Sequence, residues 1–208
     1  MEQDSLSHHA TEPSAEPASR AGKRDAVRTR IVDALIALIA SGEDISHDRV
    51  AERAQVGRRT VYRYFPDRES LMQSAWEQVT RLAGPTVSFP RTEEDLTATL
   101  LAIYEGFDSI APLATLIRST PQGRAVRLSE RKRRTASYTA AAADATKDLP
   151  PQDRLLATAM LQVLHTTPWL EMRDQWDLDG GQIARACHWA ITTLLADLRA
   201  RDGRPLDE

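Results

Sequence analysis

Apolar residues recur every three or four positions along most of this chain, and that spacing constrains the fold more than any other feature. Val27, Ile31 and Leu35, for example, fall on one face of a helix. No segment alternates apolar and polar residues for long enough to predict a β-strand. Because Gly and Pro divide the periodic stretches into separate elements, the sequence predicts an all-α protein of about nine helices.

The bounds of these helices follow from residues that cap or break them. Ser46 and Asp67 are suitable N-caps, and Pro151 suits a first turn. Residues 84–91, which include Gly84 and Pro85, are expected to form a linker. The expected helices span 23–41, 47–54, 58–64, 68–83, 93–109, a short stretch between Pro112 and Pro121, 121–147, 151–166 and 180–201.

The two ends of the chain are expected to be tails. Residues 1–19 have almost no apolar content and cannot bury enough surface to offset the entropy lost on ordering, so a disordered tail is expected. His8 and His9 could bind a metal ion, although an adjacent pair in such a tail is more often solvated. Residues 203–208 are expected to form a flexible tail. Between the tails we expect a DNA-binding domain over 20–66 and a ligand-binding and dimerisation domain over 67–202.

Composition narrows the class of protein. Cys187 is the only cysteine, so no disulfide can form within the chain. No stretch approaches the roughly 18 consecutive apolar residues of a membrane helix, and the N-terminus lacks the basic and apolar pattern of a secretory signal. These features favour a cytoplasmic location. Residues 20–70 carry eleven Lys and Arg against eight Asp and Glu, although the whole chain has a net charge of −3.

The most informative segment is SHDRVAERAQVGRRTVYRYFPDRESL, residues 46–71. Two short expected helices are separated by a tight turn at residues 55–57. The second has Val61 and Phe65 on one side and Arg, Thr and Tyr residues elsewhere. This division is what a recognition helix needs, because one face must dock on its own domain while the other offers donors to base edges and phosphates in the major groove. The segment therefore predicts a helix-turn-helix within a three-helix N-terminal domain.

This segment resembles the N-terminal signature of the TetR family of transcriptional regulators, and the helical layout is similar along residues 23–201. Two positions depart from the family pattern. Gln55 stands where Gly is usual, in a turn that commonly needs a left-handed backbone, which costs a non-Gly residue about 1 kcal/mol or more. Gly57 stands where a capping Ser is usual. The matching residues are Ala54, Val56, Thr60, Val61, Tyr62, Tyr64, Phe65 and Arg68.

The resemblance implies which side chains contact double-stranded DNA. Arg58, Arg59 and Arg63 are the candidates for base edges, and Tyr62 for a thymine methyl group or a phosphate. The others are expected to hold the backbone, with Arg68 helped by the positive end of its helix. The full expected set is Arg24, Arg28, His47, Arg58, Arg59, Thr60, Tyr62, Arg63, Tyr64 and Arg68. If they were isolated, these residues would be read as solvated charges on exposed helices.

The resemblance also implies a homodimer, formed through the eighth and ninth expected helices, 151–166 and 180–201. A two-fold dimer would read a palindromic operator. Cys187 lies on the stripe of the last helix and is interpreted as a small buried hydrophobe rather than a redox switch. The apolar stripe that fits this role consists of Ile183, Cys187, Ala190, Ile191, Leu194, Leu195 and Leu198.

Family members usually hold an effector in a cavity of the C-terminal domain, and its binding releases DNA. The resemblance thus implies a repressor that responds to a small apolar or aromatic molecule. The alternative for each candidate is an ordinary core position, and Arg118 could equally lie on the surface or pair with an anionic group. The candidates are Trp76, Tyr104, Phe107, Arg118, Tyr138, Met160, Leu164, His165 and Trp169.

Other interpretations stay open. The basic run at residues 131–134 covers all sides of a helical turn and is expected to be a solvated face, with an anionic ligand or partner as the alternative. No Gly-rich phosphate loop, metal-ligand spacing or activated nucleophile is present, so no enzyme, catalytic residue, cofactor or metal is expected. A TetR-like protein-binding adaptor without specific operator binding is the alternative function.

Overall fold

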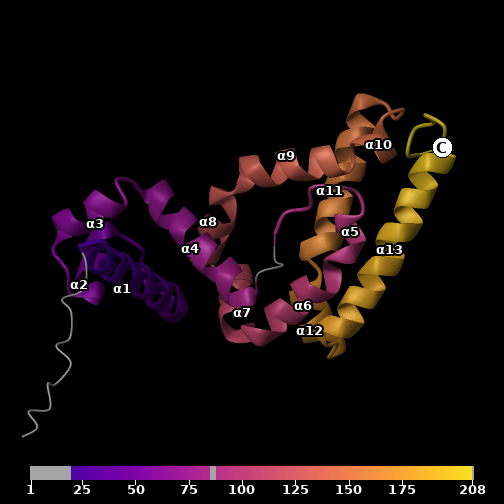
Figure 1. Cartoon of the computed structure of the whole chain (residues 1–208). Helices are drawn as coiled ribbons and strands as arrows, with labels where there is room; N and C mark the ends of the chain where they lie inside the picture. The colour runs from indigo at the N-terminus through magenta and orange to yellow at the C-terminus, as the bar shows by residue number, and fades with distance from the viewer. Residues whose placement is uncertain (1–19, 85–87, 208) are drawn as a thin grey trace, which may run out of the picture.

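The computed structural model describes residues 20–84 and 88–207, and every regular element in these ranges is a helix (Figure 1). The expected all-α class is confirmed. The helices are α1 (Arg20–Ser41), α2 (His47–Ala54), α3 (Arg58–Tyr64), α4 (Arg68–Ala83), α5 (Asp95–Ala98), α6 (Leu100–Ser109), α7 (Ala111–Ser119), α8 (Pro121–Ser129), α9 (Arg131–Ala141), α10 (Ala143–Thr146), α11 (Pro151–Thr166), α12 (Trp169–Trp176) and α13 (Gly180–Ala200).

Four helices, α2, α3, α4 and α11, have the bounds that the sequence predicts. Side-chain caps mark the starts of two of them. The Ser46 side chain accepts a hydrogen bond from the Arg49 backbone N–H at the start of α2. Asp67 and Ser70 form a reciprocal capping box at the start of α4. These local hydrogen bonds satisfy backbone donors that a helix leaves unpaired, which is why short motifs locate the helix starts.

The described residues contain more helical segments than the nine expected. The expected helix over 93–109 is interrupted at Thr99, and the expected helix over 121–147 is interrupted at Glu130 and Ala142. Each interrupting residue keeps a backbone close to helical, for example φ −90° and ψ 0° at Ala142. The apolar spacing therefore continues through each bend, and the sequence pattern does not reveal it. The helix α12, after Pro168, is a further segment without its own expected bounds.

Two apolar cores organise the molecule. The first is formed by α1 to α4 and also includes Ile117 from α7 and Val126 from α8, both almost fully buried. The second is formed mainly by α5, α6 and α9 to α13, with Tyr104, Tyr138 and Trp169 as its largest buried side chains. The N-terminal core thus extends past the boundary at residue 66 that the sequence suggests.

Helix α4 connects the two parts of the molecule. It begins four residues after the end of α3 and runs toward α6, α7 and α8 (Figure 1). It packs against α1 at one end and against α6 and α8 farther along. One continuous helix therefore contacts both the N-terminal helices and the C-terminal ones.

The C-terminal segment packs against the folded domain, whereas the N-terminal segment and part of the linker lie outside the described residues. Residues 1–19, with His8 and His9, lie outside the described residues, as do linker residues 85–87. Residues 203–207, expected to be a flexible tail, fold back: the Leu206 N–H donates to Asp153 Oδ2 at 3.2 Å, and the Leu206 side chain packs against the second core.

No single helix among the described residues combines the length and apolar content needed to cross a membrane. One pair of helical stretches, Asp95–Ser109 and Ala111–Ser119, bent by 97°, passes the same test by length and composition only.

Candidate functional site

The turn between α2 and α3 has the left-handed backbone that the sequence predicts. Gln55 has φ 52° and ψ 47° and caps the C-terminus of α2. Gly57 caps α3 without a side-chain hydrogen bond. Since Gly and Asn adopt this conformation most easily, Gln55 carries local strain. The turn fixes the angle at which α3 leaves α2.

Helix α3 separates a buried face from an exposed polar face. Val61 and, just after the helix, Phe65 are buried in the first core. Arg58, Arg59 and Arg63 are exposed, and 40% of the Tyr62 side-chain surface is accessible. The helix therefore presents three guanidinium groups and one phenol ring to solvent from a rigid base.

His47 and Arg58, two of the expected DNA contacts, both interact with Tyr62. His47 Nε2 hydrogen-bonds the Phe65 carbonyl oxygen at 2.8 Å, and its ring stacks on Tyr62 with centroids 4.2 Å apart. Arg58 Nε pairs with Asp48 Oδ1 at 2.9 Å, and its guanidinium lies 5.5 Å from the Tyr62 ring centroid. The hydrogen bond to Tyr62 and the charge of Asp48 raise the pKa of Arg58. His47 thus positions Tyr62, and Arg58 must leave or share Asp48 to bind DNA.

Arg59 and Arg63 are less engaged. No ion pair of either is found among the described residues, and Arg63 lies 5.4 Å from the Tyr64 ring centroid. Thr60 is half-buried near the start of α3. Arg59 and Arg63 are therefore the side chains of α3 best placed to meet an external anion or base edge.

The remaining expected contacts brace the N-terminal helices. The Tyr64 hydroxyl donates to the Arg24 carbonyl oxygen at 3.2 Å. Arg28 pairs with Glu77 Oε2 at 3.5 Å. Arg68 donates to the carbonyl oxygen of Ile45, so part of its guanidinium is already used inside the protein. Arg24 and Arg28 are exposed on α1.

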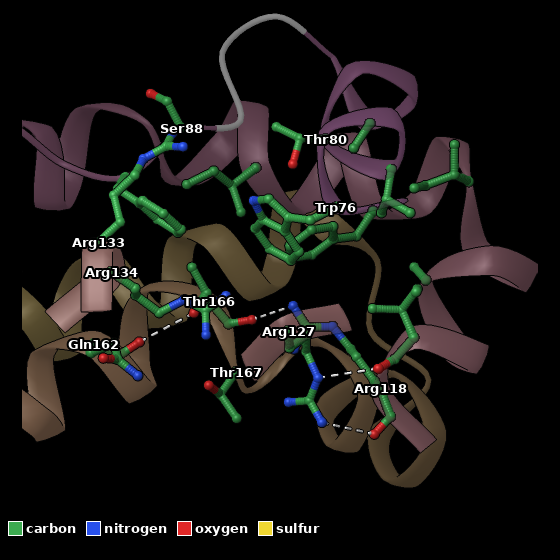
Figure 2. Close-up of a pocket in the computed structure, with 18 residues that line it drawn as sticks. Trp76, Thr80, Ser88, Arg118, Arg127, Arg133, Arg134, Gln162, Thr166 and Thr167 are labelled. Carbon is green, nitrogen blue, oxygen red and sulfur yellow. Dashed lines mark hydrogen bonds between the residues drawn. The ribbon is translucent and has the colours of Figure 1, made fainter. Parts of the chain in front are cut away.

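A cavity of about 280 Å³ lies between α4, α6, α7, α8, α9 and α11 (Figure 2). Its apolar surface includes the aromatic rings of Trp76, Phe89 and Phe107. Trp76 and Phe89 stack with centroids 6.0 Å apart. The lining residues are Trp76, Val79, Thr80, Ala83, Ser88, Phe89, Ile103, Phe107, Ile110, Ala114, Ile117, Arg118, Arg127, Arg133, Arg134, Gln162, Thr166 and Thr167.

Three of the nine expected ligand contacts line this cavity: Trp76, Phe107 and Arg118. Arg118 lies over the Phe107 ring at 4.5 Å from its centroid and donates to the Thr166 carbonyl oxygen at 2.5 Å. The sequence therefore located the wall contributed by α4, α6 and α7, where an aromatic or basic residue stands out from aliphatic neighbours.

The other six expected ligand contacts do not line the cavity. Met160 is 50% exposed on α11. The remaining five, Tyr104, Tyr138, Leu164, His165 and Trp169, pack in or against the second core, where helical spacing alone cannot separate a core position from a cavity position.

Two of these core residues are tied down by polar contacts. The Tyr104 hydroxyl donates to the Leu164 carbonyl oxygen at 2.7 Å. The Trp169 indole N–H donates to Asp108 Oδ1 at 2.8 Å, and the other oxygen of Asp108 accepts from the Gly180 N–H at 2.6 Å. Each buried polar group has a partner within the fold, so neither side chain offers a free group to a ligand.

His165 is fully buried in a satisfied network. The Thr99 hydroxyl donates to the Asp95 carbonyl oxygen at 2.7 Å, so it accepts from His165 Nε2–H at 3.0 Å. Nδ1 then accepts from the Tyr138 hydroxyl at 2.6 Å. This assignment fits a neutral imidazole, and burial lowers the pKa of His165 to about 4. The network joins α5, α9 and α11.

The cavity includes basic residues that the sequence placed elsewhere. Arg133 and Arg134 belong to the run expected to be a solvated face, but both line the cavity; Arg133 remains mostly exposed, as do Arg131 and Lys132, whereas Arg134 is half-buried. Arg134 stands four residues before the buried Tyr138, so both lie on one face of α9. This four-residue spacing was the sequence signal that could have placed Arg134 on an inward-facing side of the helix. Arg127 and Phe89 were not anticipated.

The apolar stripe of α13 packs inside the protomer. Ile183, Cys187 and Leu195 are buried in the second core, chiefly against α6. Most of the stripe is therefore used within the protomer, whereas Ala190 and Leu194 stay partly exposed. Cys187 is a buried hydrophobe, as expected. The exposed apolar side chains of α11 and α13 are instead Leu155, Leu156, Met160, Val163 and Trp189.

Comparison with known proteins matches this chain to a family model and to a curated repressor. Residues 31–75 match the family described as bacterial regulatory proteins, tetR family. The HTH-type transcriptional repressor LfrR of Mycolicibacterium smegmatis is 26% identical over 106 residues. The match covers 50% of this chain and 56% of the repressor, so the chain spans little more than half of that relative.

Two solved structures are similar at 20% sequence identity. RolR in complex with the ligand resorcinol has a TM-score of 0.43, with 91% of this chain and 99% of that chain covered. A TetR-family transcriptional regulator from Mesorhizobium loti has a TM-score of 0.45, with 86% of this chain and 98% of that chain covered.

Proposed function

We propose that this chain is a ligand-responsive transcriptional repressor of the tetR family of bacterial regulatory proteins, whose family model matches residues 31–75. One observation carries the proposal: α3 rests on a buried apolar face and exposes Arg58, Arg59 and Arg63 together with Tyr62. Similarity to a repressor over half of the chain supports repression as the mode of action. A cytoplasmic location is expected for a protein that binds bacterial DNA.

We assign base reading to Arg59 and Arg63, because an unpaired guanidinium can bond a guanine edge bidentately. Arg58 joins them once its pair with Asp48 opens, and Tyr62, held by the His47 ring, contacts a thymine methyl group or a phosphate.

The phosphate backbone is assigned to the residues around this base-reading set. Thr60 and Tyr64 are proposed to contact phosphates on either side of it. Arg24, Arg28 and Arg68 contribute positive charge nearby and brace α1 and α4.

The proposed regulator is a homodimer. The exposed apolar face formed by Leu155, Leu156, Met160, Val163 and Trp189 would bury against its two-fold equivalent. Two recognition helices related in this way read half-sites about 34 Å apart, so the operator is a palindrome. This retains the dimerisation through the helices now labelled α11 and α13 and changes only the face that is used.

The cavity is the proposed effector site. Its wall includes Trp76, Val79 and Thr80 of α4, and α4 begins four residues after the recognition helix. A ligand that displaces Trp76 moves α4 and with it α3, which alters the separation of the two recognition helices and weakens operator binding. An apolar or aromatic molecule suits the aromatic lining.

The test begins by selecting preferred sites from a random duplex library and measuring affinity for the winner against salt concentration. We expect an enriched palindrome. Arg59→Ala should weaken operator binding by about 1–3 kcal/mol, whereas Arg81→Ala, an exposed arginine of α4 outside the proposed interface, should leave it unchanged.

A protein-binding adaptor is the second candidate, since Gln55 departs from the family turn and the net charge is modest. It predicts that no sequence is enriched and that only weak, steeply salt-dependent DNA binding remains. That result would replace the repressor with the adaptor. Consumption of a bound ligand would instead indicate an enzyme.

A further inference from the structure

The cavity is strongly asymmetric in charge. Four of its lining residues are arginines, Arg118, Arg127, Arg133 and Arg134, and none of the described residues that line it is Asp or Glu. Figure 2 shows these guanidinium groups and Trp76 around one space. The rest of the lining includes aromatic and aliphatic side chains such as Trp76, Phe89 and Phe107. A molecule that fills the cavity therefore meets both aromatic rings and cations.

Three of the guanidinium groups are held in place without being neutralised. Arg118 donates to the Thr166 carbonyl oxygen at 2.5 Å, and Arg127 Nε donates to the Ile117 carbonyl oxygen at 3.1 Å. Arg134 lies over the rings of Trp76 and Phe89, 5.1 and 5.3 Å from their centroids. No ion pair of these three is found in the described part of the chain.

Arg133 is the exception among the four. Its guanidinium pairs with the buried Glu130 at 3.0 Å, and most of its side chain is exposed. Glu130 therefore compensates the arginine nearest the solvent and leaves the three deeper ones without a carboxylate partner.

The unpaired charges repel one another in a poorly solvated space. Burial and the neighbouring Arg127 lower the pKa of Arg118 to about 10. Burial is also the main cause that lowers the pKa values of Arg127 and Arg134, and a neighbouring arginine adds to it in each case, Arg124 for Arg127 and Arg127 for Arg134. Burying charges without an opposite charge nearby is unfavourable, so an anion bound among these arginines would stabilise the fold.

We propose that the effector of this cavity is a small aromatic carboxylate whose ring lies against Trp76, Phe89 and Phe107 and whose carboxylate is bound by Arg118, Arg127 and Arg134. The planar guanidinium fork matches a carboxylate, and the aromatic surface matches a flat ring. The cavity volume of about 280 Å³ limits the ligand to one or two fused rings. This inference rests on the proposed role of the cavity as the effector site.

The same geometry links the ligand charge to α4. Arg134 of α9 now covers the ring of Trp76, which belongs to α4. A carboxylate that draws the Arg134 guanidinium toward itself removes this contact and frees Trp76 to move. Anion binding and displacement of α4 are thus two results of one side-chain rearrangement.

The test compares two compounds of the same shape, 2-naphthoate and the uncharged 2-naphthamide, by calorimetric titration of the full-length protein. We expect the acid to bind at least about tenfold more tightly, because hydrogen bonds between ionised partners are roughly twice as strong as neutral ones. Arg118→Gln and Arg134→Gln should each reduce this preference toward parity while leaving the affinity for the amide nearly unchanged. Arg131→Gln, the same substitution on the exposed face of α9, should keep the preference.

Thermal melts of the variants show whether each one is folded. Equal affinities of the acid and the amide, a preference that survives in both cavity variants, or no binding of either compound would overturn the proposal. A separate measurement, whether a bound compound releases the selected operator from the protein, tests the proposed function. If an uncharged aromatic compound releases the operator and the protein shows no preference for acids, the role as a ligand-responsive regulator is supported and the proposal of a carboxylate effector is overturned. An acid that binds through Arg118 and Arg134 but leaves the operator bound supports the carboxylate and contradicts the effector role.

Discussion

His165 shows how a single titratable side chain ties the stability of this fold to pH. Its pKa is lowered from 6.5 to about 4 by burial, so between these values the unfolded chain binds more protons than the folded one. Stability is therefore complete above about pH 6.5 and is lost as the pH falls toward about 4, by up to about 3 kcal/mol. Thermal melts across this range measure the loss.

A matched pair of variants isolates this effect. His165→Gln should lose less stability than the wild-type protein on going from about pH 7 to about pH 4.5, since it has no imidazole to charge. His188→Gln alters an exposed histidine of α13 and should keep the wild-type pH dependence. If His165→Gln retains the full slope, other groups cause the acid sensitivity.

The turn between α2 and α3 is an element whose strain can be removed. Gln55 occupies a left-handed conformation that Gly adopts without a Cβ penalty. Relief of the left-handed strain is worth about 1–2 kcal/mol, and the greater backbone entropy of glycine offsets about 0.5–1 kcal/mol of it, so Gln55→Gly should raise the free energy of unfolding by roughly 0.5–1 kcal/mol. Gln55→Ala keeps the Cβ and should show no gain. Denaturant titration followed by circular dichroism measures both.

The close packing of α13 on α6 depends on a glycine at the start of α13, Gly180. A Cβ at Gly180 would lie 2.6 Å from the Tyr104 carbonyl carbon, which is backbone and cannot easily move. Gly180→Ala should therefore destabilise the protein by about 1–3 kcal/mol through overpacking. At the neighbouring Gly181 a Cβ meets only Asp179 Oδ1, at 3.3 Å, so Gly181→Ala should change the melting temperature little. Equal effects of the two substitutions would contradict the close approach.

At the scale of the whole molecule, the exposed apolar face of α11 is the proposed contact between subunits. Met160→Glu and Val163→Glu place a charge where the proposed interface would exclude water, so each should convert a dimer into monomers. Sedimentation velocity measures this directly. Trp176→Ala removes a large exposed residue of α12 and serves as the control. Dimers that persist in both glutamate variants would place the interface elsewhere.

Prediction from the sequence was most accurate for short helices whose ends are set by neighbouring capping or helix-breaking residues. Ser46, Asp67 and Pro66 locate α2, α3 and α4, and the alternation of buried and exposed residues on α3 identifies its outer face. The cavity was predicted less well, because it depends on which helical faces meet after long-range packing. Arg134 and His165 illustrate the limit: the first was expected in solvent and lines the cavity, and the second was expected at a ligand and is core.

The N-terminal core includes Ile117 and Val126, contributed by helices that begin more than forty residues after α3 ends. An engineer who joined residues 20–66 to a different sensor would leave the surface beneath these two side chains without its cover. A functional chimera would need to carry α4, α7 and α8 along with the DNA-reading helices. The transferable unit of this protein is therefore defined by shared packing and not by the end of a sequence motif.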